Sequence, residues 1–164
     1  MNLFQIALTL STLLCSLVAG FVFAFAIVVM PGIQNLNDRD FLQTFKVIDR
    51  VIQNNQPIFI LVWVGSIAVV IASAWLGILQ LDGIDRLLII IASVTYLLGV
   101  QLPTITINIP LNNQLQTLDL DSMSEPALQN ARKQFEPRWV KWNSIRTVLA
   151  ILTSVLLILL VFRI

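Results

Sequence analysis

The sequence predicts an all-α four-helix transmembrane bundle with two cytoplasmic interfacial helices. Apolar residues make up 57% of the 164 positions, charged residues only 12%, and the mean hydropathy is +0.87, which is far from the composition of a soluble domain. Four apolar runs, at about residues 3–30, 58–81, 87–108 and 143–163, reach the length of about 20 residues that a helix needs to cross a bilayer. They leave no length for a second domain, so residues 1–164 are expected to form one unit.

Composition also excludes several function classes. A net charge of +1 predicts neither a nucleic-acid partner nor a site for acidic substrates. The single Cys15 cannot form an internal disulfide, and the absence of histidine removes histidine-based zinc sites, bis-histidine haem and histidine acid–base catalysis. We therefore expect no metal site and no cofactor. The four runs contain no Asp or Glu, which disfavours proton-coupled transport.

The first apolar run covers residues 3–30. A cleaved signal peptide is the alternative, because Ala24 and Ala26 resemble a small-x-small cleavage site. The run is too long for a signal peptide and has no Lys or Arg before it, so a transmembrane helix is favoured. Pro31 and Gly32 are predicted to end this helix.

An amphipathic helix is predicted to follow, starting at Asp38 with Asn37 as its cap. Its apolar residues recur at helical spacing on one face, at Phe41, Phe45, Ile48 and Ile52. Its charged residues face elsewhere, at Asp40, Lys46, Asp49 and Arg50. Such a helix is expected to lie on the membrane interface or to cover the mouth of the bundle.

The second and third apolar runs are joined by a tight turn at Asp82 and Gly83. In the second run, Trp63 and Trp75 lie near the two ends, as tryptophans at the membrane interface do. The later half of the third run is polar around a kinking Pro103, with Thr95, Gln101, Thr104, Thr106 and Asn108. Gln101, Thr104 and Asn108 share one helical face, which is expected to point into the protein because polar groups in lipid need partners.

The longest polar segment, residues 111–136, follows Pro110. Ser122 and Glu125 fit a capping box that would open a short helix, and Pro137 is predicted to break that helix before the last run begins. This short helix is the second interfacial helix of the predicted fold.

Basic residues predict the orientation in the membrane. The first and third loops, with the adjoining rim of the last run, hold eight of the ten, at Arg39, Lys46, Arg50, Arg132, Lys133, Arg138, Lys141 and Arg146. Only Arg86 and Arg163 lie on the other side. The positive-inside rule therefore predicts that the two long loops are cytoplasmic and both termini extracytoplasmic.

The two halves of the chain also suggest an internal duplication. Pro31 and Pro110 each follow a span and precede two amides and a leucine, and the next prolines, Pro57 and Pro137, follow at similar distances. Each half would then read span, turn, interfacial helix, span, related by a two-fold axis along the membrane normal. The alternative is that helices leaving a membrane commonly stop at proline.

Polar side chains gather where the last apolar run begins. Trp139, Trp142, Asn143 and Arg146 share one helical face. Asn108, Asn112 and Asn113 end the third run at the same membrane boundary, and Gln34 and Asn35 would join them if the halves pair. One interpretation is a functional pocket, and the other is an Arg146 that extends to lipid headgroups beside interfacial tryptophans.

Three short patches resemble the anthrone oxygenase-like family of small four-span membrane proteins. They are Met30 to Gly32 after the first run, Asn108 to Asn112 after the third, and the stretch Arg138 to Thr147. The resemblance implies that a polyketide anthrone is oxidised to an anthraquinone through an anthracenolate that meets O2, without metal or flavin. This chain's lack of iron or copper ligands suits such a reaction.

The resemblance also implies roles for the polar cluster. Arg146, with Asn108 or Asn112, would stabilise the anthracenolate oxygen, and Trp139 or Trp142 would stack on a flat tricycle. Asn113 and Asn143 complete the predicted ligand-binding set. No His, buried carboxylate or buried Lys is predicted at the site, so an amide-held water, Glu136 or Asp119 would have to serve as the base.

Two functions follow from these patterns. One is a non-enzymatic membrane protein whose cytoplasmic mouth binds a lipid or a small aromatic molecule. The other is a cofactor-free oxygenase of a flat phenolic substrate. A closed apolar cavity beside Arg146 and Asn108 would favour a small-molecule site. Membrane lipid is the expected surrounding, and Gly20 and Gly65 permit dimerisation without requiring it.

Overall fold

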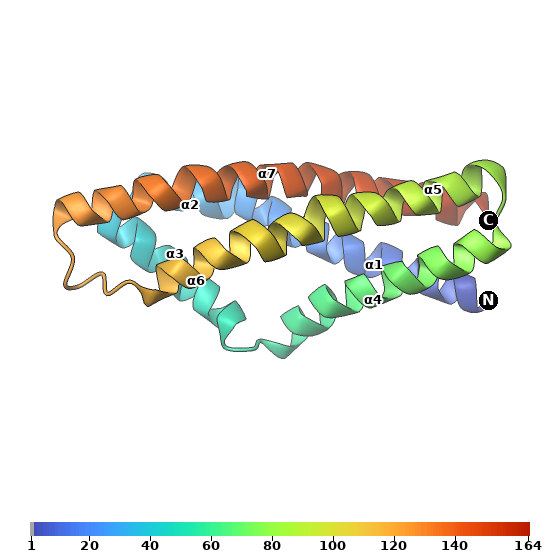
Figure 1. Cartoon of the computed structure of the whole chain (residues 1–164), viewed down its shortest axis with the longest axis horizontal. Coiled ribbons are helices and arrows are strands. Elements are labelled where there is room, and N and C mark those ends of the chain that lie inside the picture. The colour runs from blue at the N-terminus through green and yellow to red at the C-terminus, as the bar shows by residue number, and fades with distance from the viewer. Residues whose placement is uncertain (1) are drawn as a thin grey trace.

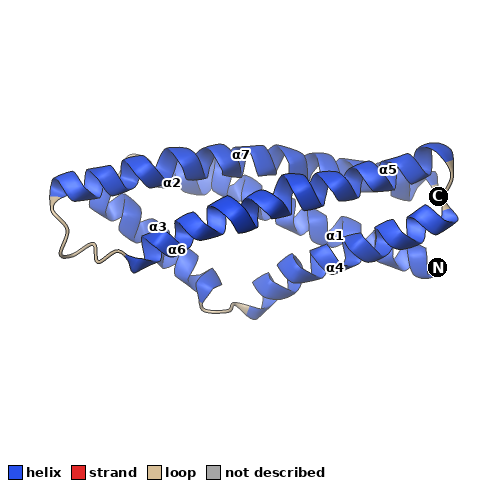
Figure 2. Cartoon of the chain, viewed as in Figure 1, coloured by secondary structure: helices blue, strands red, loops and turns tan. Residues whose placement is uncertain are grey.

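The computed structural model describes residues 2–164, and within that range all regular structure is helical (Figure 2). The chain forms five continuous helices. The first joins α1 (Leu3–Ala24), the π-helical η1 (Phe25–Val29) and α2 (Met30–Ile33). The second and third are α3 (Asp38–Gln53) and α4 (Pro57–Gln80). The fourth joins α5 (Gly83–Val94), the π-helical η2 (Thr95–Gln101) and η3 (Thr104–Asn108), and α6 (Ile109–Thr117), and the fifth is α7 (Glu125–Arg163).

Four of these helices are long and apolar enough to cross a membrane, namely Leu3–Ile33, Pro57–Gln80, Gly83–Thr117 and Glu125–Arg163. At a rise of about 1.5 Å per residue, a helix of the length of α4 spans about 36 Å, which exceeds the hydrocarbon core of a bilayer of about 30 Å. Their outward faces expose large apolar side chains along most of their length. The prediction of an all-α chain with four such helices is confirmed.

The long helices run side by side along the long axis of the molecule, with both termini at one end and α3 at the other (Figure 1). α1 packs against α4 and α7, and α5 packs against the same two helices. Their shared core is apolar and includes Leu8, Val18, Ile89, Tyr96 and Leu157. α4 diverges from its neighbours toward its N-terminal end, where the chain arrives from α3 (Figure 1).

Three prolines that were expected to end helices lie inside them. Pro31 and Pro110 are the second residues of α2 and α6, which directly follow the π-helical segments η1 and η3 within continuous helices. Proline and π-helical turns both interrupt the α-helical hydrogen-bond pattern without necessarily ending a helix. Pro137 lies within α7. Its missing N–H leaves the carbonyl of Lys133 unpaired in the helix, and both residues are exposed, so that carbonyl lies on the outer side of α7. The predicted second interfacial helix is therefore the first part of α7.

Of the two helix caps predicted from the sequence, the cap of α3 is confirmed and the cap of α7 is wrong. Asn37 caps α3, and its side chain accepts a hydrogen bond of 2.9 Å from the backbone N–H of Asp40. The cap of α7 is Ser124, not Ser122, and the predicted capping box does not form. The side chain of Ser122 instead bonds the carbonyl of Asp119 in the connection before α7.

The buried face of α3 differs from the predicted face. Phe41, Leu42 and Phe45 are buried as apolar residues, but Lys46 and Asp49 are buried with them, at 7% and 3% exposure. α3 packs against both α6 and α7, so a wider arc of its surface is covered than a helix resting on one neighbour would bury. The prediction that Lys46 and Asp49 face outward is wrong.

Basic side chains attach α3 and α7 to the connections around them. Arg39 donates to the carbonyls of Leu120 and Met123, and the ammonium group of Lys46 donates to the carbonyl of Leu118, just after α6. Arg132 of α7 donates to the carbonyls of Gln34 and Leu36, just after α2. These contacts satisfy carbonyls that have no partner within a helix, because they follow the last turns of α6 and α2.

The two halves of the chain do not share the predicted pattern. In the first half, a separate helix, α3, stands between two long helices. In the second half, the helix passes through Pro110 to Thr117, and the segment expected to match α3 is continuous with α7. The pattern of span, turn, interfacial helix and span therefore describes the first half only.

Candidate functional site

A cavity of about 90 Å³ lies where α3 meets the long helices. One set of its lining residues is aromatic: Phe21, Phe25, Phe45, Phe59, Trp63 and Trp139. A second set is polar or charged, namely Asp49, Thr104, Asn108, Asn112, Asn143 and Arg146, and Ile52 and Ile109 complete the wall. On the outer face of α7 at this level, exposed Lys141 and Ser144 give way to exposed Val148. The cavity therefore lies near the boundary between the apolar part of the molecule and its more polar end.

Arg146 is buried at the wall of this cavity. It is 6% exposed and donates hydrogen bonds of 2.9 Å to Oγ1 of Thr104 and 3.0 Å to Oδ1 of Asn143. Its guanidinium carbon lies 5.6 Å from the ring centroid of Trp139, and its Nε has no hydrogen-bond partner. Within residues 2–164, no carboxylate forms a salt bridge with Arg146. A buried positive charge without a counter-charge is costly, so an electron-rich ligand would be stabilised beside it.

The partners of Arg146 are placed by unusual backbone. Thr104 and Asn108 belong to η3, and Gln101 ends η2, so the inward-facing polar row lies on π-helical turns. All three are buried as the helical face predicts, at 3% exposure for Gln101, 4% for Thr104 and 2% for Asn108. π-helical turns are frequent at functional sites. In this protein the π-helical segments η2 and η3, which carry Gln101, Thr104 and Asn108, pack against α7.

Two buried amides, Asn108 and Gln101, each keep one polar atom without a hydrogen-bond partner. Asn108 Nδ2 donates a 3.4 Å hydrogen bond to the carbonyl of Trp139, whereas its Oδ1 has no partner. Gln101 Oε1 accepts from the indole N–H of Trp63 at 2.9 Å, whereas its Nε2 has no partner. Of the two residues, only Asn108 lines the cavity. Buried polar atoms are nearly always hydrogen-bonded in native proteins, so the unpaired Oδ1 of Asn108 would be satisfied by a hydrogen bond from a ligand or water.

Asp49 brings a carboxylate to the same cavity. Its Oδ1 accepts a 2.7 Å hydrogen bond from Asn112, and its Oδ2 accepts bonds of 2.9 Å from Gln116 and 3.1 Å from Gln53. All three donors are neutral amides. Within the described part of the chain, no cation forms a salt bridge with Asp49.

A short chain of contacts links this carboxylate to Arg146. Asn112 donates to Asp49 and accepts a 2.8 Å hydrogen bond from the indole N–H of Trp139. The ring of Trp139 in turn faces the guanidinium of Arg146. The cavity thus carries a buried negative group on α3 and a buried positive group on α7, each held by neutral partners.

The aromatic residues form one connected cluster, in which Phe21 meets Phe25 with ring centroids 5.1 Å apart. Trp139 packs against Phe25 and Phe45, with ring centroids 5.6 and 5.1 Å apart. Phe59 stacks on Trp63 at 5.2 Å and meets Phe21 at 5.1 Å. Trp63 was expected to be an interfacial anchor, but it lines the cavity, whereas Trp75 is 68% exposed. Flat aromatic ligands are favoured by such surfaces.

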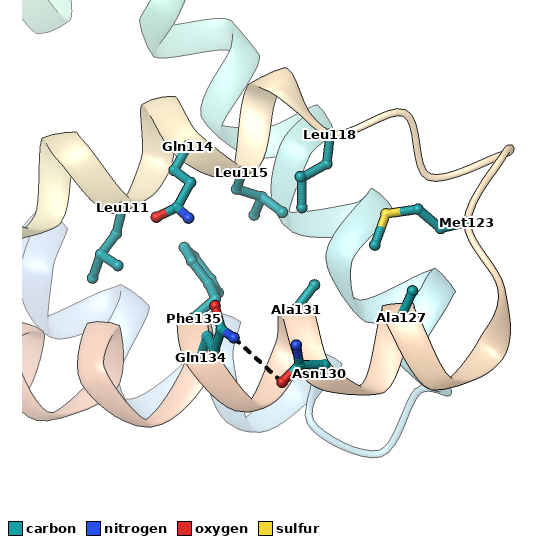
Figure 3. A pocket seen from close by; sticks show the side chains of 10 residues that line it. All are labelled: Leu111, Gln114, Leu115, Leu118, Met123, Ala127, Asn130, Ala131, Gln134 and Phe135. Carbon is teal, nitrogen blue, oxygen red and sulfur yellow. Dashed lines mark hydrogen bonds between the residues drawn. The ribbon is translucent and has the colours of Figure 1, made fainter.

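One further hollow adjoins the cavity, and another lies apart from it. A groove of about 330 Å³ between α1 and α4 shares Phe21, Phe59 and Trp63 with the cavity, on the side where α4 diverges. A second hollow of about 260 Å³ lies between α6 and the first part of α7, with Leu111, Leu115 and Phe135 among its walls (Figure 3). None of the residues predicted for the site lines this second hollow.

The structure brings together five of the seven predicted site residues. Arg146, Asn108, Asn112, Trp139 and Asn143 all line the cavity. Trp142, although predicted on the same face, does not line it, and neither does Asn113, which is exposed and accepts a hydrogen bond from Gln53.

The remaining candidates lie elsewhere. Gln34 and Asn35 are exposed and border a separate surface hollow beside Arg132. Of the two carboxylates considered as a base, Glu136 accepts from Arg132 at 2.7 Å and Asp119 is exposed. Neither lines the cavity.

Sequence reasoning missed the contribution of α3 to the site. The apolar spacing of this helix predicts that Asp49 faces away from the stripe of Phe41, Phe45, Ile48 and Ile52, and the pattern of a single helix cannot show a second packing partner. A spacing of four and eight residues links Asp49 to Phe45 and Phe41, and this was the available signal.

Within residues 2–164, no group of three His, Cys, Asp or Glu side chains is placed to hold a metal ion.

The fold and the cavity define an all-helical membrane protein of four long apolar helices with a polar and aromatic cavity at one end. The sequence model of the anthrone oxygenase family matches residues 53–156, and the chain belongs to that family. The matched segment contains Arg146, Asn108 and Trp139 but begins after Asp49. Searches of curated proteins and of solved structures gave no match.

Proposed function

We propose that this protein binds a flat phenolic molecule in the cavity and oxidises it with O2 without a cofactor. The observation that carries the proposal is the pairing of a buried, uncompensated Arg146, with an open Nε, and an Asn108 with an open Oδ1 on the wall of one cavity. The guanidinium stabilises a phenolate or enolate oxygen, and the amide oxygen accepts a hydrogen bond from a phenolic hydroxyl.

The family gives the chemistry for this site. An anthrone has a carbonyl and a ring methylene in its central ring, and loss of a methylene proton yields an aromatic anthracenolate that O2 oxidises. Arg146 lowers the barrier by holding the developing oxyanion in a site poor in water, where fixed donors are worth most. Asn143 and Thr104 orient the guanidinium through their hydrogen bonds. Trp139 and Phe25 offer aromatic surface for stacking.

The size of the cavity bears on how a ligand enters. About 90 Å³ holds only a few water molecules, whereas drug-sized ligands occupy pockets of about 300 Å³ or more. A tricyclic molecule therefore enters only when part of the wall moves. Phe21, Phe59 and Trp63 separate the cavity from the apolar groove between α1 and α4, and displacement of these rings joins the two spaces.

The proposed setting is a four-helix bundle that spans the bilayer as a single domain, residues 1–164. The excess of basic residues around α3 and the first part of α7 supports a cytoplasmic location for that end and an extracytoplasmic location for both termini. α3 lies at the membrane interface and closes the bundle mouth over the cavity. Its partners are membrane lipid and a small aromatic ligand, and no nucleic acid is involved.

A second candidate function is ligand binding without catalysis. The open atoms of Asn108 and Arg146 favour a bound polar aromatic or quinone-like molecule whether or not it reacts. In that case the protein would hold its ligand unchanged in the presence of O2.

One experiment separates these functions. Anthrone binding to purified protein in lipid nanodiscs is followed by quenching of tryptophan fluorescence, and its oxidation by O2 uptake and anthraquinone absorbance. The wild type is expected to bind and to oxidise above the spontaneous rate. Arg146→Ala is expected to lose about 10²-fold or more in oxidation rate. Arg138→Ala, on the exposed face of the same helix, is the matched control and is expected to leave the rate unchanged.

Each outcome has a meaning. Binding without oxidation above background supports the non-catalytic function. No anthrone binding by the wild type contradicts the oxygenase function and removes anthrone as the ligand of the second function. Equal oxidation by wild type and Arg146→Ala removes Arg146 from the reaction.

A further inference from the structure

Asp49 is the one carboxylate among the residues that line the cavity. An ionised carboxylate has about four acceptor positions, and the structure fills three of them, with Asn112, Gln116 and Gln53. With a side chain buried at 3% exposure, the remaining acceptor capacity faces protein or cavity and not bulk solvent.

We propose that Asp49 is the catalytic base that removes the methylene proton of the substrate. This inference rests on the proposed function, because it assigns a role within the same cavity. The positively charged group that stabilises the product oxyanion comes from α7, whereas the base comes from α3. A substrate between the two helices then meets the base at its C–H group and the guanidinium at its oxygen.

The step balances with O2 as the only oxidant. Asp49 takes one methylene proton, and the electron pair of that C–H bond passes into the ring system, giving the anthracenolate beside Arg146. The anthracenolate transfers one electron to O2, and the resulting radical pair combines at the former methylene carbon to form a peroxide anion.

The peroxide then collapses to the product. The second hydrogen of that carbon passes to the departing oxygen as the O–O bond breaks, which leaves a new carbonyl and hydroxide. Protonated Asp49 returns its proton to the hydroxide, so one anthrone and one O2 give one anthraquinone and one water. The carboxylate ends in its starting state.

The surroundings of Asp49 fit this role better than those of the other carboxylates considered. Glu136 is engaged with the guanidinium of Arg132, which also bonds Asp38 at 3.2 Å. Asp119 lies in the exposed connection before α7. Within residues 2–164 no cation forms a salt bridge with Asp49, so its carboxylate, unlike that of Glu136, is not engaged by a counter-charge.

Asn112 and Gln116 act as positioning residues for this base. Asn112 is itself fixed by the indole N–H of Trp139, and Gln116 also donates a 3.0 Å hydrogen bond to the carbonyl of Lys46. Both amides come from α6, so the α3–α6 contact sets the direction of the carboxylate. A base held in this way is ready for proton transfer before the substrate arrives.

Proton abstraction can be measured without oxidation. Anthrone is incubated with purified protein in nanodiscs under strict exclusion of O2 in D2O, and deuterium entry at the ring methylene is followed by NMR against a protein-free control. The wild type is expected to accelerate exchange. Asp49→Asn is expected to bind anthrone with an affinity close to that of the wild type. Its rate of deuterium exchange is expected to fall by about 10²-fold or more. Asp119→Asn is the matched control and is expected to exchange at the wild-type rate.

The possible results decide the proposal separately from the function. If the wild type neither binds anthrone nor accelerates its exchange, the proposed function fails. If the wild type does both and Asp49→Asn exchanges at the same rate, Asp49 is not the base and the function stands. If Asp49→Asn no longer binds anthrone, deuterium exchange by Asp49→Gly is measured with and without added formate to decide whether Asp49 is the base. Formate-dependent exchange supports the assignment, and exchange that ignores formate overturns it.

Discussion

Asn112 and Asp49 lie 63 positions apart in the sequence, yet the Nδ2 of Asn112 donates a hydrogen bond of 2.7 Å to the Oδ1 of Asp49. The contact joins α6 to α3. It fixes the one acidic side chain at the cavity wall and, through the bond from Trp139 to Asn112, connects it to α7. The side chain of Asn112 therefore links three helices.

Asn112→Ala tests this amide. The substitution leaves the indole N–H of Trp139 and one oxygen of Asp49 without their partner, so the free energy of unfolding is expected to fall by about 1–3 kcal/mol. The oxidation rate is expected to fall with it. Denaturation in detergent followed by tryptophan fluorescence measures the first effect. Asn113→Ala removes an exposed neighbour and is expected to change stability by no more than about 0.5 kcal/mol, so equal losses in both variants would contradict the assignment.

Thr104→Val tests how Arg146 is held. Valine keeps the shape of the side chain but removes the hydroxyl that accepts from the guanidinium at 2.9 Å, so a buried charged donor loses its partner at a cost of about 1.5–3 kcal/mol. Thermal unfolding in detergent checks this value. Thr106→Val is the control, because the hydroxyl of Thr106 is exposed and bonds only the carbonyl of Leu102 in its own helix. A Thr104→Val protein as stable as Thr106→Val would show that Arg146 needs no such partner.

Phe59→Ala tests the wall between the groove and the cavity. Removing this ring opens the cavity toward the space of about 330 Å³ between α1 and α4, and anthrone is expected to bind faster in nanodiscs, with a smaller effect on its dissociation. Stopped-flow quenching of tryptophan fluorescence gives both rates. Leu61→Ala, at a position 69% exposed on the same helix, is the control. An unchanged association rate in Phe59→Ala would place the entrance elsewhere.

Arg132→Lys tests the connection between α2 and α3. Arg132 donates to Gln34, Leu36, Glu136 and Asp38 and lies 4.2 Å from the ring centroid of Phe41. A lysine cannot reproduce this planar fork of donors, so stability is expected to fall by about 2 kcal/mol or more. Arg138→Lys, at an exposed position of the same helix, is expected to be neutral in the same unfolding assay. A neutral Arg132→Lys would mean that charge alone matters here.

The proposed orientation is open to a labelling test. Cys15 is buried, so a Cys15→Ser protein provides a background for single cysteines at Lys133, before the cavity, and at Asp82, in the tight turn. A maleimide that does not cross membranes is expected to label intact cells at Asp82→Cys only, and both sites after permeabilisation. The reverse pattern would invert the protein in the membrane.

The positions of the long helices were predictable because about 20 consecutive apolar residues have few alternatives to a membrane helix. Their ends were not. Proline does not always end a helix. Pro31 and Pro110 lie just after π-helical segments within continuous helices, and Pro137 lies on an exposed face of α7. The sequence does not show where a helix changes to π-helical hydrogen bonding, so these continuations could not be read from it.

The site was predictable on one side only. Helical spacing placed Asn143 and Arg146 on one face of the last helix, and the end of the third apolar run supplied Asn108 and Asn112. The α3 side was missed because a charged residue with buried amide partners looks the same in sequence as one in water. For Asp49, one amide partner comes from its own helix and two come from α6, and the contact between these helices cannot be read from the sequence.

The unbroken course of α7 through Pro137 has a mechanical consequence. One helix carries three residues spaced seven positions apart. Arg132 binds the α2–α3 connection, and Trp139 and Arg146 border the cavity. A single residue inserted between Arg132 and Trp139 would rotate everything beyond it by about 100°. The contact of Arg132 with the α2–α3 connection and the cavity wall at Trp139 and Arg146 thus stay on one side of the molecule only while the length of this segment is unchanged.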